Sequence, residues 1–258
     1  MPSALSERFA AIAGIRFGAL PAEPVRRLPT GIAPLDDLLG GGWPRGHVSE
    51  IAGAPSSGRT AVLHAALAAA TRRGEVVALI DVPDALDPPS LARAGAVLER
   101  VLWVRPPSPR AALKCAELVL DAGGFGIVAL DGIDETPSGQ ATARARSLPR
   151  HVWPRLAHVT RRAGAVCVVC APRRVVGGAA AVAVRLAQRR ARWDGRLFAG
   201  LATTAVLERS RFGPAERAVV LAVGDRLGAL DGVRIELLGA VAGGGVEEGR
   251  AAASATGG

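Results

Sequence analysis

The chain has 258 residues, of which 49% are hydrophobic and 21% charged, so it can bury a sizeable core within one large domain. Three cysteines are too few for a disulfide framework and predict a reducing compartment. The sequence shows neither the pattern of a signal peptide nor a run of about 18 uninterrupted apolar residues. Composition therefore excludes a secreted disulfide scaffold and a helical membrane protein, and predicts a soluble, cytoplasmic protein.

The formal net charge is +9, and almost all of the positive charge is arginine, because Lys114 is the only lysine. Such a charge favours a polyanionic partner such as nucleic acid. The alternative is a basic composition that the whole proteome shares. In so lysine-poor a chain, the exchange of a lysine for an arginine needs cautious interpretation.

In chain order, the predicted elements alternate between helices and strands. We expect a short helix over 3–14, a linker over 21–29, a strand ending at Ile51, a helix over 60–72, a strand over 76–80, an irregular Pro-rich segment over 82–89 with a further helix after it, a strand over 101–104, a helix over 109–122, a strand over 127–130, a helix over 151–162 and a strand over 166–170. Apolar strands that alternate with helices predict an α/β fold with a mostly parallel central sheet.

The last third of the chain alternates more loosely. Segments 197–207, 219–223 and 233–238 predict antiparallel strands at the edge of the sheet, and residues 241–258 are rich in Gly, Ala and Ser without an apolar face, which predicts a disordered tail. We therefore expect an N-terminal helix and linker over 1–27, a core domain over 28–240 and a tail over 241–258.

Two cysteines, Cys167 and Cys170, form a C-x-x-C pattern inside an apolar run. On a strand, residues three apart point to opposite faces, so these two thiols cannot share a metal ion. They are predicted to be small residues of the core.

Residues 53–60 read Gly-Ala-Pro-Ser-Ser-Gly-Arg-Thr, which is a phosphate-binding loop except that Arg59 replaces the usual lysine. In such a loop the backbone N–H groups wrap the phosphates, here from Gly53 through Ser56, Ser57 and Gly58, and the Thr60 hydroxyl binds Mg²⁺. The predicted cofactors are ATP and Mg²⁺. The alternative is a Gly-rich turn without a ligand.

Asp131 follows the apolar strand 127–130 and is the expected partner of this loop. A carboxylate at that position lies beside the loop and can hold the water shell of the metal. Thr60 and Asp131 are therefore the predicted metal residues.

The series Thr-Gly…Leu-Asp…Leu-Gly-Gly-Gly…Glu-Ile-x-Gly…Ser-Ser-Gly over residues 28–60, continued by Leu79-Ile-Asp-Val-Pro-Asp-Ala-Leu-Asp-Pro88 and the Asp131 strand, resembles the core of RecA/RadA-type recombinases. The resemblance covers about residues 28–224. It implies a RecA-like P-loop core. The short length and the altered site resemble more narrowly the ImuA group, accessory proteins of bacterial mutagenic translesion synthesis.

The resemblance implies losses in the machinery for ATP hydrolysis. Pro83 stands where the family has a glutamate that activates the attacking water, and Ala171 stands where it has a glutamine that senses the γ-phosphate. Asp84, beside Pro83, would need a different backbone path to act as the base. Loss of a positioned base costs ~10²–10⁴-fold in rate. The chain is therefore expected to bind nucleotide and to hydrolyse it slowly at best.

Other family positions are kept or changed in ways that bear on binding. Asp87 matches an aspartate that contacts the adenine, whereas Ser90 replaces a tyrosine that stacks on the base. Arg209 and Arg211 match a pair of lysines that reach the nucleotide of a neighbouring subunit, where they act as trans-acting cations. Their alternative is a solvated basic turn.

Two basic segments match the DNA-binding loops of the family. The first, 132–150, carries Arg144, Arg146 and Arg150, and the second, 172–192, begins with Arg173 and Arg174 and also holds Arg185, Arg189, Arg190 and Arg192. Arginines with flexible glycines neutralise phosphates of single-stranded DNA without reading its sequence. The alternatives are a solvated basic face and, for 182–192, an amphipathic helix against a protein partner.

The leading hypothesis is an accessory protein of the SOS response and translesion synthesis, with RecA or a translesion polymerase complex as its partner and the helix over 3–14 as a docking segment. Single-stranded DNA and further copies of the chain are additional candidate partners. The competing hypothesis is an active DNA-dependent ATPase or recombinase. A nucleotide-binding regulator unrelated to DNA is a third.

Overall fold

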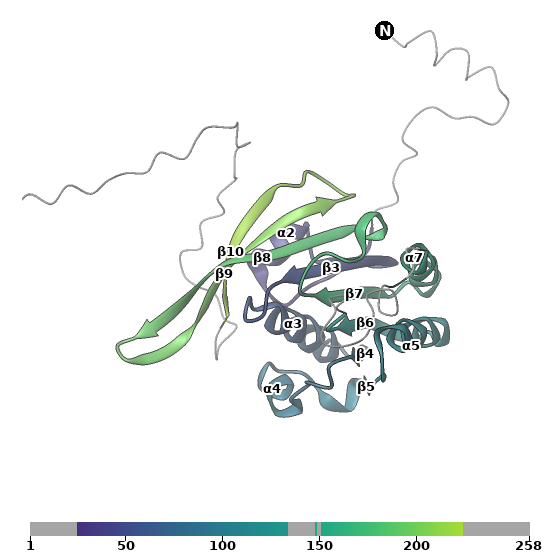
Figure 1. Cartoon of the computed structure of the whole chain (residues 1–258), viewed down its shortest axis with the longest axis horizontal. Coiled ribbons are helices and arrows are strands. Elements are labelled where there is room, and N and C mark those ends of the chain that lie inside the picture. Colours follow the sequence, from purple (N-terminus) through teal and green to yellow (C-terminus); the bar gives the residue numbers. More distant parts are fainter. Residues whose placement is uncertain (1–24, 134–147, 149–150, 224–258) are drawn as a thin grey trace, which may run out of the picture.

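The computed structural model describes residues 25–133, 148 and 151–223. Its centre is an eight-stranded sheet in the order β10-β9-β8-β3-β7-β6-β4-β5. The strands are β3 His47–Gly53, β4 Val76–Asp81, β5 Val101–Val104, β6 Phe125–Asp131, β7 Val166–Ala171, β8 Val182–Asp194, β9 Leu197–Ser210 and β10 Arg217–Val223, and a separate two-stranded sheet joins β1 Arg27–Leu28 to β2 Trp43–Pro44. This arrangement is shown in Figure 1.

The pairing confirms the predicted α/β fold. Strands β3 to β8 all run parallel to one another, whereas β9 is antiparallel to both β8 and β10. The parallel strands are buried because helices cover both faces of the sheet, which is why their sequences are continuously apolar.

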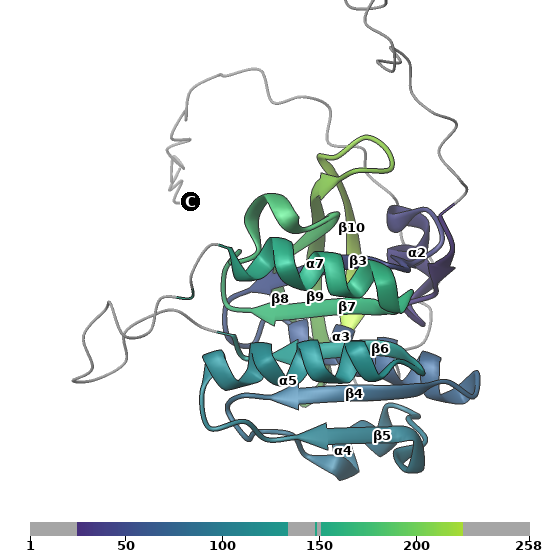
Figure 2. The ribbon, with the colours of Figure 1, turned by 90° about the vertical axis from the view of Figure 1, so that its right-hand side faces the viewer.

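The helices form one layer on each face. They are α2 Ala33–Leu39, α3 Arg59–Arg72, α4 Pro88–Arg93, α5 Pro109–Ala122 and α7 Val152–Ala163. Figure 2 shows α5 and α7 side by side on one face, with α3 on the other. Helix α3 buries its Ala- and Leu-rich surface almost all round, so it shows little amphipathic pattern, whereas α5 and α7 each keep a polar face toward solvent.

The parallel register brings the carboxyl ends of several strands to one edge. Asp81 pairs with Asp131, Asp131 pairs with Cys170, and Ala52 pairs with Ala171. The loop that follows β3 therefore begins beside the ends of β4, β6 and β7. In open α/β sheets this edge is where ligands bind.

The strands β8 and β9 form a long ribbon that extends away from the body of the sheet (Figure 1). Strand β3 pairs with β8 only from Val182 to Leu186, so the rest of β8 has β9 as its partner. The alternative of a helix over 182–192 is wrong, because the residues follow a period of two: Val184 and Leu186 are buried and Arg185 between them is exposed. The second predicted DNA loop is accordingly shorter than expected and ends before Val182.

Most sequence-predicted elements are confirmed with small shifts at their ends. Strand β3 continues to Gly53 rather than ending at Ile51. The helix predicted before residue 101 is α4, and a short 3₁₀ turn, Leu98–Arg100, follows it. The N-terminal helix, the strand over 233–238 and the tail lie outside the described residues. Within the part of the chain that is described, no helix is long and apolar enough to cross a membrane.

Cys167 and Cys170 lie on opposite faces of β7, as predicted. Cys167 packs with the residues under α5 and α7, and Cys170 packs with those under α3. Burial raises the pKa of the Cys167 thiol from 9.0 to about 12, and burial raises the pKa of Cys170 well above its ordinary value. Both thiols are therefore neutral core groups.

The buried thiols predict a specific dependence on pH. Because the pKa of Cys167 is higher in the folded state, its contribution to stability is full below pH 9.0 and is lost as the pH rises toward about 12. We expect the urea midpoint to fall across that window. Thiol titration at about pH 8 should label the half-buried Cys115 promptly and the other two cysteines only on unfolding. Prompt labelling of all three thiols would contradict this packing.

The Gly40-Gly41-Gly42 run forms the sharp turn between α2 and β2. Gly40 ends α2 in the left-handed region with φ 71° and has open space around it. Gly42 has φ 112°, and a side chain there would collide with the carbonyl oxygen of Leu28 and the backbone of Pro29. The turn directs the fully buried Trp43 into the core. Gly42 is thus required for a close approach of two backbones, and Gly40 only for its conformation.

Alanine substitutions separate these two requirements. Gly40→Ala should cost about 1 kcal/mol from left-handed strain alone. Gly42→Ala adds a backbone collision, so roughly 2–5 kcal/mol is expected. Urea denaturation followed by circular dichroism measures both values. Equal losses for the two variants would show that the collision is relieved by a small shift of the backbone.

Candidate nucleotide site

The loop after β3 has the backbone of a phosphate cradle. Ser56 is in the left-handed region with φ 59°, and Gly58 is the N-cap residue of α3 with φ 91°. The side chain of Ser57 fills the space beside Gly53, so any larger residue at Gly53 would collide with it. These constraints aim the backbone of the loop at the N-terminus of α3.

The N-terminus of α3 offers donors for an anion. No side chain caps it, no acidic residue lies in its first turn, and the first N–H groups of a helix have no partner within the helix. The Ser57 hydroxyl, 3% exposed, and the Arg59 Nε are buried and have no hydrogen-bond partner. Unsatisfied buried donors at a helix N-terminus fit a phosphate group. Ser56 and Thr60 are exposed at the same turn.

Arg59 folds back onto its own loop. Its guanidinium NH1 donates to the carbonyl oxygen of Gly53 at 2.6 Å. Burial raises the pKa of the Asp131 carboxyl group at the end of β6, and the positive charge of Arg59 is one of the effects that oppose this rise. The loop arginine therefore bonds to the residue at which its own loop begins.

Asp131 lies where the sequence places it, beside the loop. Burial raises the pKa of its carboxyl group, against the opposing effects of a hydrogen bond from the Cys170 thiol, the charge of Arg59 and the N–H of Gly132. Thr60 lies in the first turn of α3. The structure thus brings Thr60, Arg59 and Asp131 to one edge of the sheet. No group of three His, Cys, Asp or Glu side chains that could hold a metal ion occurs within the described residues.

Two residues of this edge were missed by sequence reasoning. Asp81 is 2% exposed; one carboxylate oxygen accepts from Leu86 N at 2.8 Å and from Trp103 Nε1 at 3.3 Å, and the other has no partner. His64 lies one turn after Thr60 on α3; burial lowers its pKa, and the charges of Asp131, Asp87 and Asp81 oppose that shift. Asp81 ends an apolar strand as Asp131 does, and this position in the sequence could have identified it as a residue of the site.

The segment after β4, where the family resemblance places the catalytic base, makes other contacts. The ring of Pro83 packs against Gly132, where no side chain would fit. Asp84, with φ 52°, pairs with Arg105 at 3.6 Å, and the Arg105 guanidinium lies 5.0 Å from the centroid of the Trp103 ring. The Asp84 carboxylate therefore has an ion partner at the surface, and the expectation that it would need a different backbone path to act as the base stays a prediction.

Asp87 acts as the N-cap of α4. Its carboxylate accepts from Ser90 N at 3.0 Å and from the Ser90 hydroxyl, and it lies 3.5 Å from Arg93. The hydrogen bond from the Ser90 side chain is the main cause that lowers the pKa of Asp87. Its predicted contact with adenine stays a prediction, and Ser90, the expected site of weakened base stacking, is part of this cap.

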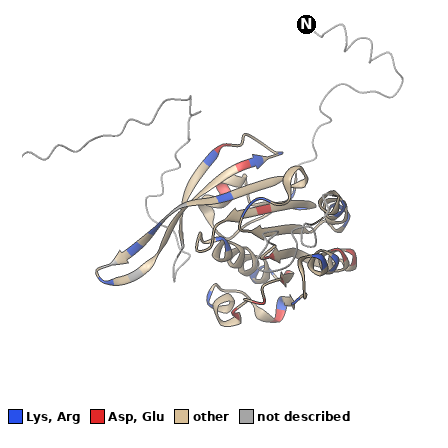
Figure 3. Cartoon of the chain, viewed as in Figure 1, with Lys and Arg blue, Asp and Glu red and all other residues tan. Residues whose placement is uncertain are grey.

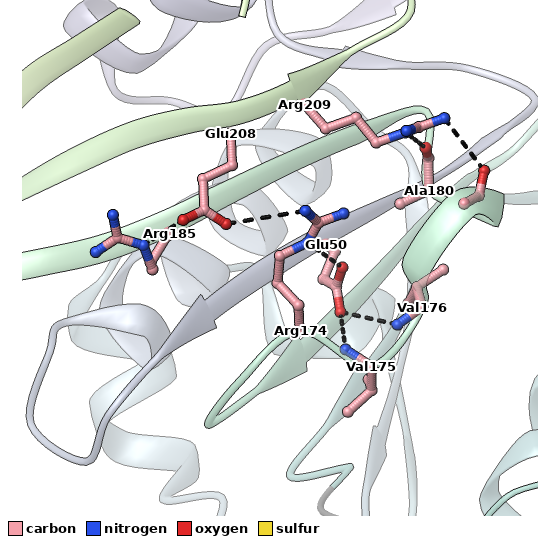
Figure 4. A network of polar contacts seen from close by, with 9 residues as sticks. Glu50, Arg174, Val175, Val176, Ala180, Arg185, Glu208 and Arg209 are labelled. Atoms are coloured by element: carbon pink, nitrogen blue, oxygen red, sulfur yellow. Dashed lines mark hydrogen bonds and ion pairs between the residues drawn. The ribbon is translucent and has the colours of Figure 1, made fainter. Parts of the chain in front are cut away.

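A buried network anchors the loop after β7 (Figure 4). Glu50, fully buried on β3, accepts from the N–H of Val175 and from that of Val176 at 2.9 Å, and Arg174 Nε lies 3.4 Å from it. Arg174 also approaches Glu208 on β9 at 4.0 Å, and Glu208 pairs with Arg185 on β8. Arg174, predicted to contact DNA, is thus engaged with two carboxylates of its own chain.

The other predicted cations have mixed surroundings. Arg209 donates to the carbonyl oxygens of Ala180 at 2.8 Å and Gly178 at 3.4 Å, and Arg211 donates to Gly178 at 2.7 Å, so both brace the 177–180 turn. Arg173 is exposed and lines a cavity of about 1000 Å³ between this turn and α7, together with His158 and Arg161. Arg144, Arg146 and Arg150 lie outside the described residues. The trans-acting and DNA-binding roles stay predictions.

Comparison with known proteins identifies the class. The RecA N-terminal domain family matches residues 3–140. Protein RecA of Thermus thermophilus is 37% identical over 131 residues, and Protein RecA of Kineococcus radiotolerans is 36% identical over 132 residues. The structure of the RadB recombinase superposes with a TM-score of 0.60 at 21% identity and covers 77% of this chain and 97% of its own.

The fold and the phosphate loop are therefore those of a RecA-like P-loop protein. The chain belongs to the RecA family through its N-terminal domain. The match spans 50% of this chain and 38% of the length of the Thermus RecA, and 51% and 38% for the Kineococcus protein.

The buried Glu50 network gives a test of this architecture. Glu50→Ala leaves two backbone N–H groups and a guanidinium without their acceptor, so the free energy of unfolding should fall by roughly 2–3 kcal/mol. Glu50→Gln keeps one acceptor and should lose less. Urea denaturation measures both, and amide exchange at Val175 and Val176 should accelerate in each. The exposed Glu99→Ala is the control, with an expected change within about 0.5 kcal/mol. An unchanged exchange rate in Glu50→Ala would contradict the anchoring role.

Proposed function

We propose that this chain is an accessory protein of DNA-damage tolerance, of the RecA-like type that the ImuA group represents. In this role it binds nucleotide and protein partners and hydrolyses ATP weakly or not at all. The observation that carries the proposal is the state of the catalytic segment, where Pro83 packs on Gly132 and the neighbouring Asp84 is paired with Arg105. The region keeps its fold without offering a base.

The chemistry separates binding from turnover. Hydrolysis needs a group that takes a proton from the attacking water, and a proline has none. Ala171, at the end of β7, likewise offers no side-chain polar atom toward a γ-phosphate. A positioned base contributes ~10²–10⁴-fold in rate, so hydrolysis without it should be slow.

In this proposal the groups that bind the nucleotide are kept, although the catalytic base is lost. The backbone of residues 53–58 and the N-terminus of α3 would hold the phosphates, the Ser57 hydroxyl and Arg59 would donate to their oxygens, and Asp87 would lie at the adenine end. ATP bound there would supply a multiply charged polyphosphate. The side chains at this edge would orient it and exclude water from its buried side.

The charge distribution supports a role beside nucleic acid. Figure 3 marks positively charged residues, in blue, along the outer end of the β8–β9 ribbon. Arg190, Arg192 and Arg196 are exposed there, and Arg173 is exposed on the loop after β7. Among the described side chains none of these arginines has an ion-pair partner, and exposed arginines favour contact with a phosphate backbone such as that of single-stranded DNA.

The proposed setting is the cytoplasm, with RecA or a translesion polymerase complex as the partner during the SOS response. Membership of the RecA family and the likeness to a RadB recombinase fold support a surface that assembles with RecA-like protomers, including further copies of this chain. We propose that residues 28–240 form the core domain and that residues 1–27 provide a docking helix and linker.

ATP hydrolysis with and without single-stranded DNA tests the proposal, alongside equilibrium binding of nucleotide. We expect turnover at least ~10²-fold below that of a competent recombinase and no increase on adding DNA. Gly58→Asp places a carboxylate at the helix N-terminus in a left-handed position, so it should abolish nucleotide binding. The control Gly213→Asp makes the same charge change at an exposed, uncrowded position and should leave binding unchanged.

Co-sedimentation with purified RecA filaments and a binding assay with a purified translesion polymerase test the partner. The accessory role predicts that the full chain binds one of them. Rapid turnover stimulated by DNA would instead identify an active DNA-dependent ATPase and refute the accessory role. Absence of nucleotide binding in the wild-type chain would leave only a role in protein assembly.

A further inference from the structure

The cavity of about 1000 Å³ lies between α7 and the loop after β7. From the helix, Pro154, His158 and Arg161 line it, and their spacing of three or four residues places them on one face of α7. Helix α7 covers the face of the sheet opposite to α3, as Figure 2 shows. The cavity is therefore separate from the phosphate loop and the N-terminus of α3.

Cationic side chains from three separate segments line this cavity. Arg161 belongs to α7, Arg173 to the loop after β7, and Arg211 follows β9, and all three are exposed. Arg174 also lines the cavity but is already paired with two carboxylates. None of the described lining residues is Asp or Glu, and no described group pairs with the side chain of Arg161 or Arg173. The lining therefore has a surplus of positive charge, which favours an anionic ligand.

The inner part of the cavity is apolar. Trp153 is 4% exposed and Val176 is 3% exposed, and both belong to the core cluster under α7. Ala157 and Val175 are half-buried beside that cluster and line the cavity as well. A buried apolar interior with charged groups around it is the arrangement by which protein interfaces take up an apolar anchor residue.

The wall of the cavity opposite α7 is held in place by hydrogen bonds. The buried Glu50 accepts from the N–H groups of Val175 and Val176, and Arg209 donates to the carbonyl oxygen of Ala180 (Figure 4). A wall that is ordered before binding loses less conformational entropy when a ligand enters. The loop after β7 therefore offers a formed surface rather than one that the ligand must order.

A single strand of DNA fits this lining less well than a peptide does. Single strands bind without sequence preference by stacking their bases on exposed aromatic rings. The one Trp or Phe of the lining is Trp153, which is buried in the core and presents no such platform. An acidic peptide needs no platform, because its carboxylates pair with guanidinium groups and an apolar side chain fills the interior.

We propose that this cavity is a docking site for an acidic peptide segment of a protein partner. An apolar side chain of the segment inserts between α7 and the loop after β7, and flanking carboxylates pair with Arg161, Arg173 and Arg211. The proposal rests on the binding of protein partners proposed above and gives it a surface and a chemistry. It does not depend on nucleotide binding at the phosphate loop.

Fluorescence anisotropy of the full chain with labelled eight-residue peptides tests the proposal. The probes carry Asp at every position but a central one, which is Leu, Phe or Trp. At least one of them should bind with a dissociation constant of roughly 100 µM or tighter. A matched peptide with Gly at the central position should bind about tenfold more weakly, because it leaves the apolar interior unfilled.

Substitution of the cavity arginines locates the site. Arg161→Gln and Arg173→Gln should each weaken binding of the best probe by about tenfold, because each removes a charged partner of a carboxylate. Arg110→Gln, an exposed position on α5 outside the lining, makes the same charge change and should stay within about twofold of wild type. Amide resonances of Gly177 and Gly178 should shift when the probe binds.

Four outcomes would overturn the docking site. They are no binding of any acidic probe, equal binding of the peptide with central Gly, equal losses in Arg110→Gln and the cavity variants, and tighter binding of an eight-nucleotide thymidine strand that both cavity variants weaken, which would identify a DNA site. Binding to RecA or to a translesion polymerase without binding of any probe would remove this site and leave the accessory role in place. Binding of a probe without either partner would keep the site and contradict the accessory role.

Discussion

The rest of the molecule is organised around one buried carboxylate, Glu50 in the central strand β3. Its strand has the parallel half of the sheet on one side and the β8–β9 ribbon on the other. A fully buried charge is costly unless it is paired, and Glu50 is paired by two backbone N–H groups and by Arg174. Those contacts fix the loop after β7, and Arg174 and Glu208 extend the network onto the ribbon. One acid therefore joins the two halves of the fold.

The same strand delivers the phosphate loop three residues later. Because β3 is held on both sides, Gly53 leaves the sheet at a fixed point, beside the ends of β6 and β7. Precision at this edge is what phosphate binding requires, since its donors are mostly backbone groups that cannot adjust as side chains do. The catalytic segment after β4 has kept its place in the fold but carries Pro83 against Gly132. In the proposed function, this segment keeps its place in the fold and has lost the catalytic group.

Sequence patterns predicted the parallel sheet well because buried strands and their helices leave strong signals. They failed for residues 182–192, where a basic and apolar alternation was open to two interpretations and only the pairing with β9 decides. The phosphate loop and Asp131 were found from spacing, but the partners of Arg59, Arg174 and Asp84 were not. The partners of Arg174, Glu50 on β3 and Glu208 on β9, lie on strands distant in sequence, so no local pattern encodes them. Asp81 was within reach, since it ends a strand as Asp131 does.

The presence of arginine rather than lysine at position 59 is by itself weak evidence for a change of function, because the whole chain has a single lysine. Its physical consequences do not depend on how it arose. A lysine at the same place would present one compact charge, whereas the Arg59 guanidinium donates to the Gly53 carbonyl oxygen and still has further N–H groups. In the proposed function, Pro83 offers no group that could accept a proton, and the task that remains for this loop is to hold a polyphosphate.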